Sequence, residues 1–144
     1  MHIKKLVVGF ETLDDFARYQ EDEAKRVRYD GKPANTIHTR NTPKQADEIL
    51  AAGGSAYRII KGRMCCHQKI LGFETIENTR KKRCIIYLDP QIIETYNTPH
   101  RPFQGWRYLK PADIAPDIAP YIIGQKTTDM PAEMQAHLRE AGLL

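Results

Sequence analysis

The stretch best suited to chemistry is 101–109, which reads Arg-Pro-Phe-Gln-Gly-Trp-Arg-Tyr-Leu. It holds the only tryptophan of the chain, together with two other aromatic side chains and two arginines. Aromatic faces stack bases and arginines hold phosphates, a combination typical of single-stranded nucleic-acid binding. In the structural alternative, the aromatic rings fill the core and the arginines lie on the surface. The ligand-binding residues predicted from this stretch are Arg101, Gln104, Trp106, Arg107 and Tyr108.

A second stretch, 53–62, joins two glycines to an alternating pattern. Alternation places Tyr57, Ile59 and Lys61 on one face of a predicted strand. If that face lines the interior of a barrel, Lys61 needs an anion as its partner, and we add it to the predicted ligand-binding residues. The structural alternatives are an exposed lysine and glycines that simply end a helix.

A loose acid–base set is formed by His38, Lys61, His67 and Glu74. A small hydrolase could use Lys61 and Glu74 as its acid–base pair, which makes them weak catalytic candidates. Nothing in the spacing brings these residues together.

The three cysteines offer a possible metal site in Cys65-Cys66-His67, with Cys84 on a neighbouring predicted strand. Zinc requires converging ligands, usually in two spaced pairs, and this spacing is poor. Small buried thiols in a sheet are the favoured interpretation, so neither a metal nor another cofactor is predicted.

The charge is unevenly distributed along the chain. Residues 1–110 carry 20 basic and 13 acidic side chains, whereas residues 111–144 carry 2 and 5. Such a basic part attracts polyanions, because each neutralised phosphate releases counterions. Lysines and arginines also keep small proteins soluble, and we interpret the run Arg80–Arg83 as a solvated turn of this kind.

A chain of 144 residues with 41% hydrophobic content predicts a single domain over residues 1–144. No apolar run is long enough to span a bilayer or to form a signal peptide, so no membrane partner is expected. Three cysteines form no readable disulfide framework, which favours the reducing cytoplasm.

The elements that must position these residues follow from periodicity and breakers. The first part predicts a strand over 3–9, a helix capped by Thr12, a polar loop over 34–42 and a helix over 43–52. The second part predicts strands over 55–61, 64–77, 83–89 and 107–110, a helical turn over 90–94 and a helix over 131–141. The fold class is therefore α+β: a small curved antiparallel sheet or partial β-barrel flanked by helices.

These residues also carry a resemblance. The chain resembles a bacterial family of short proteins classed as a domain of unknown function, through Gly-Gly-Ser-x-Tyr-x-x-Ile-Lys-Gly at 53–62 and the motif at 101–109. It departs from that pattern at Arg58, where tryptophan is expected, and at His67, where arginine is expected. The resemblance implies no activity.

In shape, the succession of helix, Gly-Gly and three strands resembles the PUA-like superfamily of ASCH and EVE type. That resemblance implies modules that bind RNA or modified bases, and a few small amidohydrolases acting on modified nucleosides. Fold alone does not decide function. We therefore expect an RNA- or modified-nucleotide-binding module, with a modified-nucleoside hydrolase and a protein-interaction or structural domain as alternatives.

Overall fold

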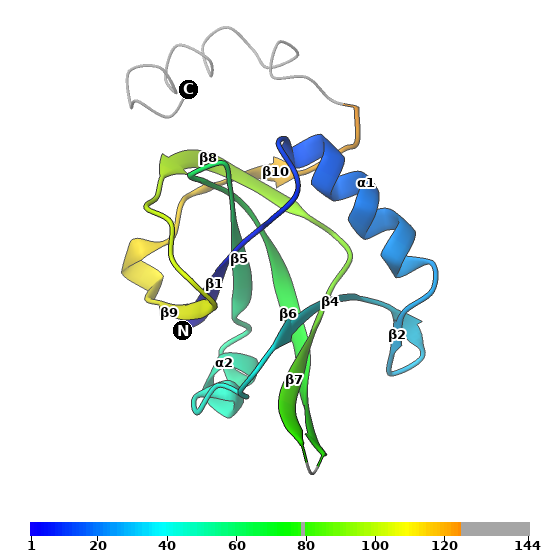
Figure 1. Ribbon diagram of the computed structural model, residues 1–144. Helices are drawn as coiled ribbons and strands as arrows, with labels where there is room; N and C mark the ends of the chain where they lie inside the picture. Colours follow the sequence, from blue (N-terminus) through cyan, green and yellow to red (C-terminus); the bar gives the residue numbers. More distant parts are fainter. Residues whose placement is uncertain (79, 125–144) are drawn as a thin grey trace, which may run out of the picture.

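The computed structural model describes residues 1–78 and 80–124, and the predicted helix over 131–141 lies outside them (Figure 1). The helices are α1 (Leu13–Ala24), α2 (Ala46–Ala51) and the short 3-10 helix η1 (Pro111–Asp113). The strands are β1 (His2–Leu6), β2 (Arg28–Tyr29), β3 (Lys32–Pro33), β4 (Asn35–Thr39), β5 (Ser55–Ile60), β6 (Arg63–Asn78), β7 (Lys81–Leu88), β8 (Ile93–Pro99), β9 (Trp106–Leu109) and β10 (Asp117–Pro120).

The long strand β6 organises the sheet. One edge of β6 pairs with β5, and β1 and β9 extend the sheet from there. Along the other edge, β8 pairs with the first half of β6 and β7 with the second half. β4 then extends the sheet beyond β7, and β10 extends it beyond β8. The strands β4 and β9 are thus two ends of one continuous run, β4-β7-β6-β5-β1-β9.

This architecture confirms the predicted α+β class with a curved sheet, which stays open instead of closing into a barrel (Figure 1). Register shifts at Leu71 in β6 and between Arg58 and Ile59 in β5 are irregularities that increase twist and bend a strand. One pair departs from the antiparallel prediction, since β1 runs parallel to β5. Within the described residues, no helix is long and apolar enough to cross a membrane.

Apolar side chains are buried on both faces of the sheet. The largest cluster and a second cluster, to which α1 adds Phe16 and Ala17, share one face, since they include Ala56 and Ile60 of β5, respectively. The other face carries a third cluster with Tyr57, Ile59 and Leu109. The main members of the largest cluster are Ile3, Ile37, Ile49, Ile86 and Leu88.

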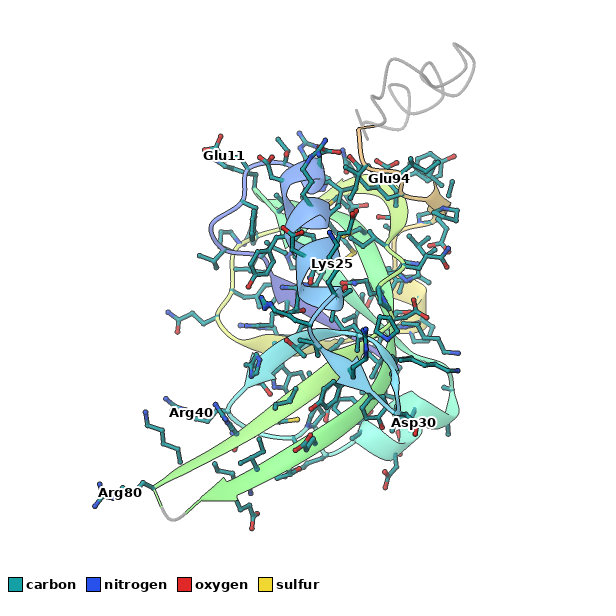
Figure 2. All side chains as sticks on the ribbon, turned by 90° about the vertical axis from the view of Figure 1, so that its right-hand side faces the viewer. Glu11, Lys25, Asp30, Arg40, Arg80 and Glu94 are labelled. Carbon is teal, nitrogen blue, oxygen red and sulfur yellow. The ribbon has the colours of Figure 1, made fainter. Side chains whose placement is uncertain are left out.

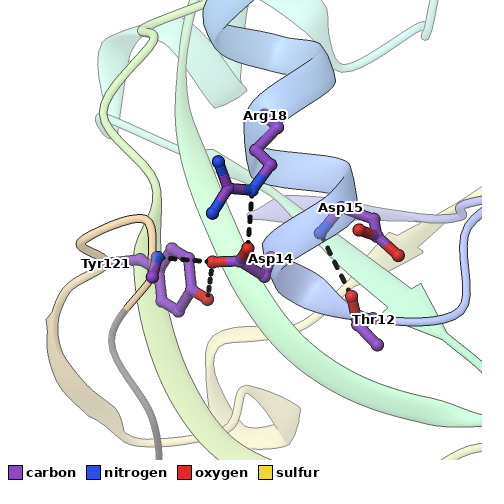
Figure 3. A network of polar contacts seen from close by, with 6 residues as sticks. Thr12, Asp14, Asp15, Arg18 and Tyr121 are labelled. Atoms are coloured by element: carbon purple, nitrogen blue, oxygen red, sulfur yellow. Dashed lines mark hydrogen bonds and ion pairs between the residues drawn. The ribbon is translucent and has the colours of Figure 1, made fainter.

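Helix α1 begins where the sequence predicts. The Thr12 hydroxyl accepts a hydrogen bond from the Asp15 backbone N–H at 3.1 Å, which satisfies one free donor of the first turn. One residue earlier, Asp14 accepts bonds from the Arg18 side chain, the Tyr121 hydroxyl and the Gly124 backbone N–H (Figure 3). We call these four residues the Asp14 cluster; it ties the segment after β10 to α1.

Two predicted segments are wrong. Residues 34–42 were expected to form a polar loop, yet they contain β4, because its polar side chains find buried partners. Asn35 Nδ2 donates to the Gln20 carbonyl at 2.7 Å, and the Thr36 hydroxyl donates to a Glu23 carboxylate oxygen at 3.0 Å. The helical turn expected over 90–94 is likewise replaced by the start of β8, which pairs with β6.

Candidate functional site: a basic groove between two strand edges

A groove of about 320 Å³ opens where the edges of β4 and β9 face each other across the inner side of the curved sheet. We call it the edge groove. None of its lining residues is acidic. Two of them, Lys5 and Arg40, are basic. The lining residues are Lys5, His38, Thr39, Arg40, Asn41, Gly105 and Trp106.

The aromatic wall of the edge groove is Trp106, the first residue of β9. Gly105 precedes it with φ +71°, a left-handed conformation that glycine adopts without strain and that turns the chain into the strand. Trp106 is half-buried: its ring meets Tyr108 edge-on, with centroids 4.8 Å apart, and packs on the largest core cluster. The indole therefore has a supported side and a side that remains accessible.

Tyr108 supports this wall instead of forming part of it. Its hydroxyl accepts a hydrogen bond from the Gln45 backbone N–H at 3.1 Å, just before α2. The contact ties β9 to the α2 segment, which fixes the position of the Trp106 ring beside it.

Lys5 lies opposite Trp106 in the antiparallel β1–β9 pair, so both side chains project from the same face. Partial burial, followed by the positive charge of Arg58, lowers the pKa of Lys5. Both effects arise because the ammonium group stands in a place where positive charge is poorly solvated and is not neutralised. An anion in the edge groove would favour the charged ammonium group and so offset both effects.

Behind Lys5 lies the buried cation Arg58, 7% exposed. Its guanidinium donates to the backbone carbonyls of Lys5 at 3.3 Å and Leu6 at 3.5 Å, and it faces the Phe16 ring at 5.1 Å. No ion pair joins it to a carboxylate within the described residues, and burial lowers its pKa to about 10. Arg58 therefore fixes the backbone that carries Lys5 and adds positive potential behind the edge groove.

The opposite wall comes from the end of β4 and the residues that follow it. β4 pairs with β7 from Asn35 to Thr39, and Thr39 lies opposite Cys84. The chain then leaves the sheet at Arg40. The Thr39 hydroxyl donates to the Asn41 carbonyl at 3.1 Å, which shapes this exit. His38 and Arg40 thus reach the edge groove from a segment more than sixty residues away from Trp106 in the chain.

The other predicted residues of the aromatic stretch lie elsewhere. Arg107 pairs with Lys4 on the face of β9 opposite to Trp106, and its guanidinium carbon lies 5.4 Å from the centre of the Phe103 ring. Arg101 and Gln104 are exposed in the loop before β9. The structure therefore brings Trp106 into the edge groove and places these three residues outside its lining.

Lys61 does not line an interior. It occupies the β5–β6 turn with φ +51°, followed by Gly62 at +74°, so the predicted strand over 55–61 ends one residue earlier, at Ile60. Its ammonium group is exposed and bonds to the Glu11 carboxylate at 3.2 Å. The surface alternative describes what the structure shows at this position.

The proposed acid–base pair is not assembled. Lys61 precedes β6 and bonds to Glu11, whereas Glu74 lies in the second half of β6 and accepts a hydrogen bond from the Tyr87 hydroxyl at 2.7 Å. His67 is also engaged elsewhere, with its Nε2 atom 2.8 Å from an Asp117 carboxylate oxygen. These contacts leave the four residues of the loose set dispersed over the sheet.

The three cysteines are buried free thiols, in agreement with their predicted place in a sheet. The contact with the Cys65 thiol, followed by burial, raises the pKa of Cys66, which disfavours its reactive thiolate. Among residues 1–78 and 80–124, no group of three or more His, Cys, Asp and Glu side chains is arranged to hold a metal ion.

Among the polar residues that line the edge groove, sequence reasoning missed Lys5, Thr39, Arg40 and Asn41. Lys5 lies in the first strand beside a second lysine, Lys4, and Arg40 lies in a stretch predicted as loop, so neither carries a local signal. The only signal was the pairing of the aromatic edge strand β9 with the basic first strand β1. This pairing cannot be recognised without knowing the order of strands in the sheet.

Comparison with known proteins identifies a family and nothing more specific. A family described as "Protein of unknown function (DUF1489)" matches residues 3–144, nearly the whole chain. In the comparisons with curated proteins and with solved structures, nothing matches.

Proposed function

We propose that this chain, which belongs to the DUF1489 family, binds a nucleotide unit in the edge groove. The observation that carries the proposal is that the single tryptophan shares one groove with Lys5, His38 and Arg40 and with no acid. An indole face stacks on any base, and cations bind the phosphate attached to it.

The polar side chains of the groove suit this ligand. Arg40 offers a planar guanidinium for phosphate oxygens, and Lys5 offers a compact charge. Asn41 and Thr39 have amide and hydroxyl groups that can meet base or sugar edges. A volume of about 320 Å³ lies at the small end of ligand pockets, the size expected for one nucleotide rather than for a large cofactor.

The same class of ligand, RNA or a modified nucleotide, is the one that the sequence leads us to expect. The hydrolase alternative has no such support, because Lys61 and Glu74 bond to other residues. The proposal is therefore recognition without an assigned reaction.

Trp106 provides its own reporter, since it is the only tryptophan of the chain. Titration with the four ribonucleoside monophosphates should quench its fluorescence through stacking, and the quenching should saturate. Arg40→Gln and Lys5→Gln should each weaken binding about tenfold, the equivalent of ~1.4 kcal/mol for a lost charge-assisted contact.

Arg107→Gln is the matched control, because it removes a neighbouring arginine from the opposite face of the same strand. Its affinity should equal that of the wild type. Saturable quenching that is insensitive to Arg40→Gln and Lys5→Gln would reject the edge groove as the site, and absence of quenching by every nucleotide would reject the function.

A further inference from the structure

The hairpin formed by the ends of β6 and β7 projects from the body of the molecule (Figures 1 and 2). β4 pairs with β7 only as far as Cys84, so beyond that point no further strand of the described residues lies beside β6 and β7. We call the described residues of this projection, 76–78 and 80–83, the arm. A two-stranded ribbon contributes little core, so its exposed side chains are the feature that calls for explanation.

The arm is strongly basic. Arg80, Lys81, Lys82 and Arg83 are all exposed, whereas Glu77 is the one acidic residue of the arm. Lys82 lies 3.9 Å from the Glu77 carboxylate, an exposed ion pair. The remaining three cations form no ion pair within the described part of the chain.

The arm begins beside the edge groove. Thr39 pairs with Cys84, so Arg40, which lines the groove, follows directly at the level where Arg83 starts the arm. Figure 2 shows Arg40 near the base of the projecting hairpin and Arg80 at its end. Basic side chains therefore continue from the groove to the end of the arm.

We infer that the ligand of the edge groove is a segment of single-stranded polynucleotide, with one unpaired base in the groove and the adjoining phosphates along the arm. This inference rests on the proposed function and names its substrate class. It also replaces the interpretation of Arg80–Arg83 as a merely solvated turn.

The dimensions set a length. From Cys84 to Arg80 the arm extends about 13 Å at ~3.3 Å per residue. A stacked nucleic-acid strand carries one phosphate per ~3.4 Å of helix axis and an extended strand carries fewer, so the arm spans at most about four phosphates. Binding should strengthen with oligonucleotide length up to about six nucleotides and change little beyond that.

The test compares the binding of uridine monophosphate with that of a fluorescent mixed-sequence RNA hexamer. Quenching of Trp106 fluorescence reports the monophosphate, and anisotropy reports the hexamer over a range of salt concentrations. The arm variant Arg80→Gln/Lys81→Gln/Arg83→Gln leaves the Lys82–Glu77 pair in place. We expect it to weaken hexamer binding at least tenfold and to reduce the slope of log affinity against log salt by about 2, since each lost phosphate contact contributes ~0.7. Affinity for the monophosphate should not change.

A matched control removes three cations elsewhere: Lys25→Gln/Arg26→Gln/Lys32→Gln changes exposed residues at the end of α1 and in β3. This control should bind the hexamer like the wild type. A fully paired RNA duplex should compete poorly, because it offers no free base to the groove.

Each failure has its own signature. Equal hexamer affinity of wild type and arm variant overturns the inference and leaves the proposed function standing. A duplex that competes as well as the hexamer also overturns it. If the wild-type protein does not bind the monophosphate, the proposed function is rejected, and the inference with it.

Discussion

The edge groove and the Asp14 cluster are both concentrations of charged groups, yet they differ in how their charge is met. In the Asp14 cluster, one carboxylate accepts bonds from Arg18, Tyr121 and Gly124 at 2.6–2.8 Å, and these bonds lower the pKa of Asp14 to about 2 (Figure 3). In the edge groove, Lys5 and Arg40 have no acidic neighbour in the lining.

The pKa shifts of the two regions have the same direction but opposite meaning. Asp14 is shifted toward its charged form, because its surroundings already supply the donors that a carboxylate needs. Lys5 is shifted toward its neutral form, because burial and Arg58 oppose its charge. The first cluster is complete within the chain, whereas we propose that the second is completed by an anion from outside.

The strongest test of this difference is removal of the cation behind the edge groove. Arg58→Ala leaves the carbonyls of Lys5 and Leu6 without their donor and opens a cavity beside Phe16. We expect the free energy of unfolding to fall by on the order of 3 kcal/mol, measured by urea denaturation.

Arg58→Met separates packing from charge, since it keeps most of the volume and removes a desolvated cation. It should cost less than half as much as Arg58→Ala, because an unpaired buried charge carries its own penalty. The pKa of Lys5 should rise in Arg58→Met, as followed by NMR, because the nearby positive charge is gone. If the pKa of Lys5 is the same in Arg58→Met as in the wild type, burial alone lowers it.

The second largest effect is expected at Asp14. Asp14→Asn should destabilise the protein at neutral pH, whereas Asp15→Asn, whose carboxylate takes no part in the cluster, should not. Nucleotide affinity should be unaffected by either change, since the cluster is not part of the edge groove lining. A loss of affinity in Asp14→Asn would contradict the separation of the two regions.

The pH dependence of this effect has a definite sign. The folded-state pKa of Asp14, about 2, lies below its ordinary value of 3.8. The stabilisation is therefore fully present above the ordinary value and is lost as pH falls through about 2. The difference in unfolding free energy between wild type and Asp14→Asn should shrink as pH falls from 3.8 to about 2. If the difference stays constant, the destabilisation in Asp14→Asn arises from geometry and not from the charge of Asp14.

The sequence allowed the core elements of both regions to be predicted for local reasons. Thr12 and the acids after it mark the start of α1, and alternation with β-branched residues marks β5 and β7. Strand β4 was missed because its buried Asn35 and half-buried Thr36 are polar, and only partners far away in the sequence, such as the Gln20 carbonyl and the Glu23 carboxylate, make their burial favourable. Local composition contains no such information.

The aromatic side chain of the edge groove could be predicted from the sequence, and its two basic side chains, Lys5 and Arg40, could not. Trp106 stands out by type and by its neighbours, whereas Lys5 and Arg40 reach the groove through sheet curvature and strand order. Lys61 shows the opposite error, since an alternating pattern does not reveal that the strand ends at Ile60 in a turn with positive φ. Periodicity predicts which face a residue takes, but not where two edges meet.

A smaller effect should appear at Lys5 and concerns affinity rather than stability. An anion binds the charged ammonium, so affinity should fall at alkaline pH, and earlier than for an ordinary lysine because the pKa of Lys5 is lowered. Lys5→Arg keeps its charge to higher pH and should flatten this profile, with a difference of up to about tenfold, ~1.4 kcal/mol, at the alkaline end. Lys4→Arg, on the opposite face, should retain the wild-type profile, and a flattened profile there would assign the titration to another group.

The smallest expected effect isolates one bond of the complete cluster. Tyr121→Phe keeps the ring and removes the hydroxyl that donates to Asp14 at 2.8 Å. We expect a loss of about 1 kcal/mol or less in unfolding free energy and a rise in the pKa of Asp14, measured by NMR titration, because two of its three donors remain. Tyr19→Phe is the matched control, since it removes a hydroxyl from an exposed ring on α1, the helix that carries Asp14. If both variants leave the pKa of Asp14 at about 2, the bonds from Gly124 and Arg18 alone suffice, and the cluster is more redundant than its geometry indicates.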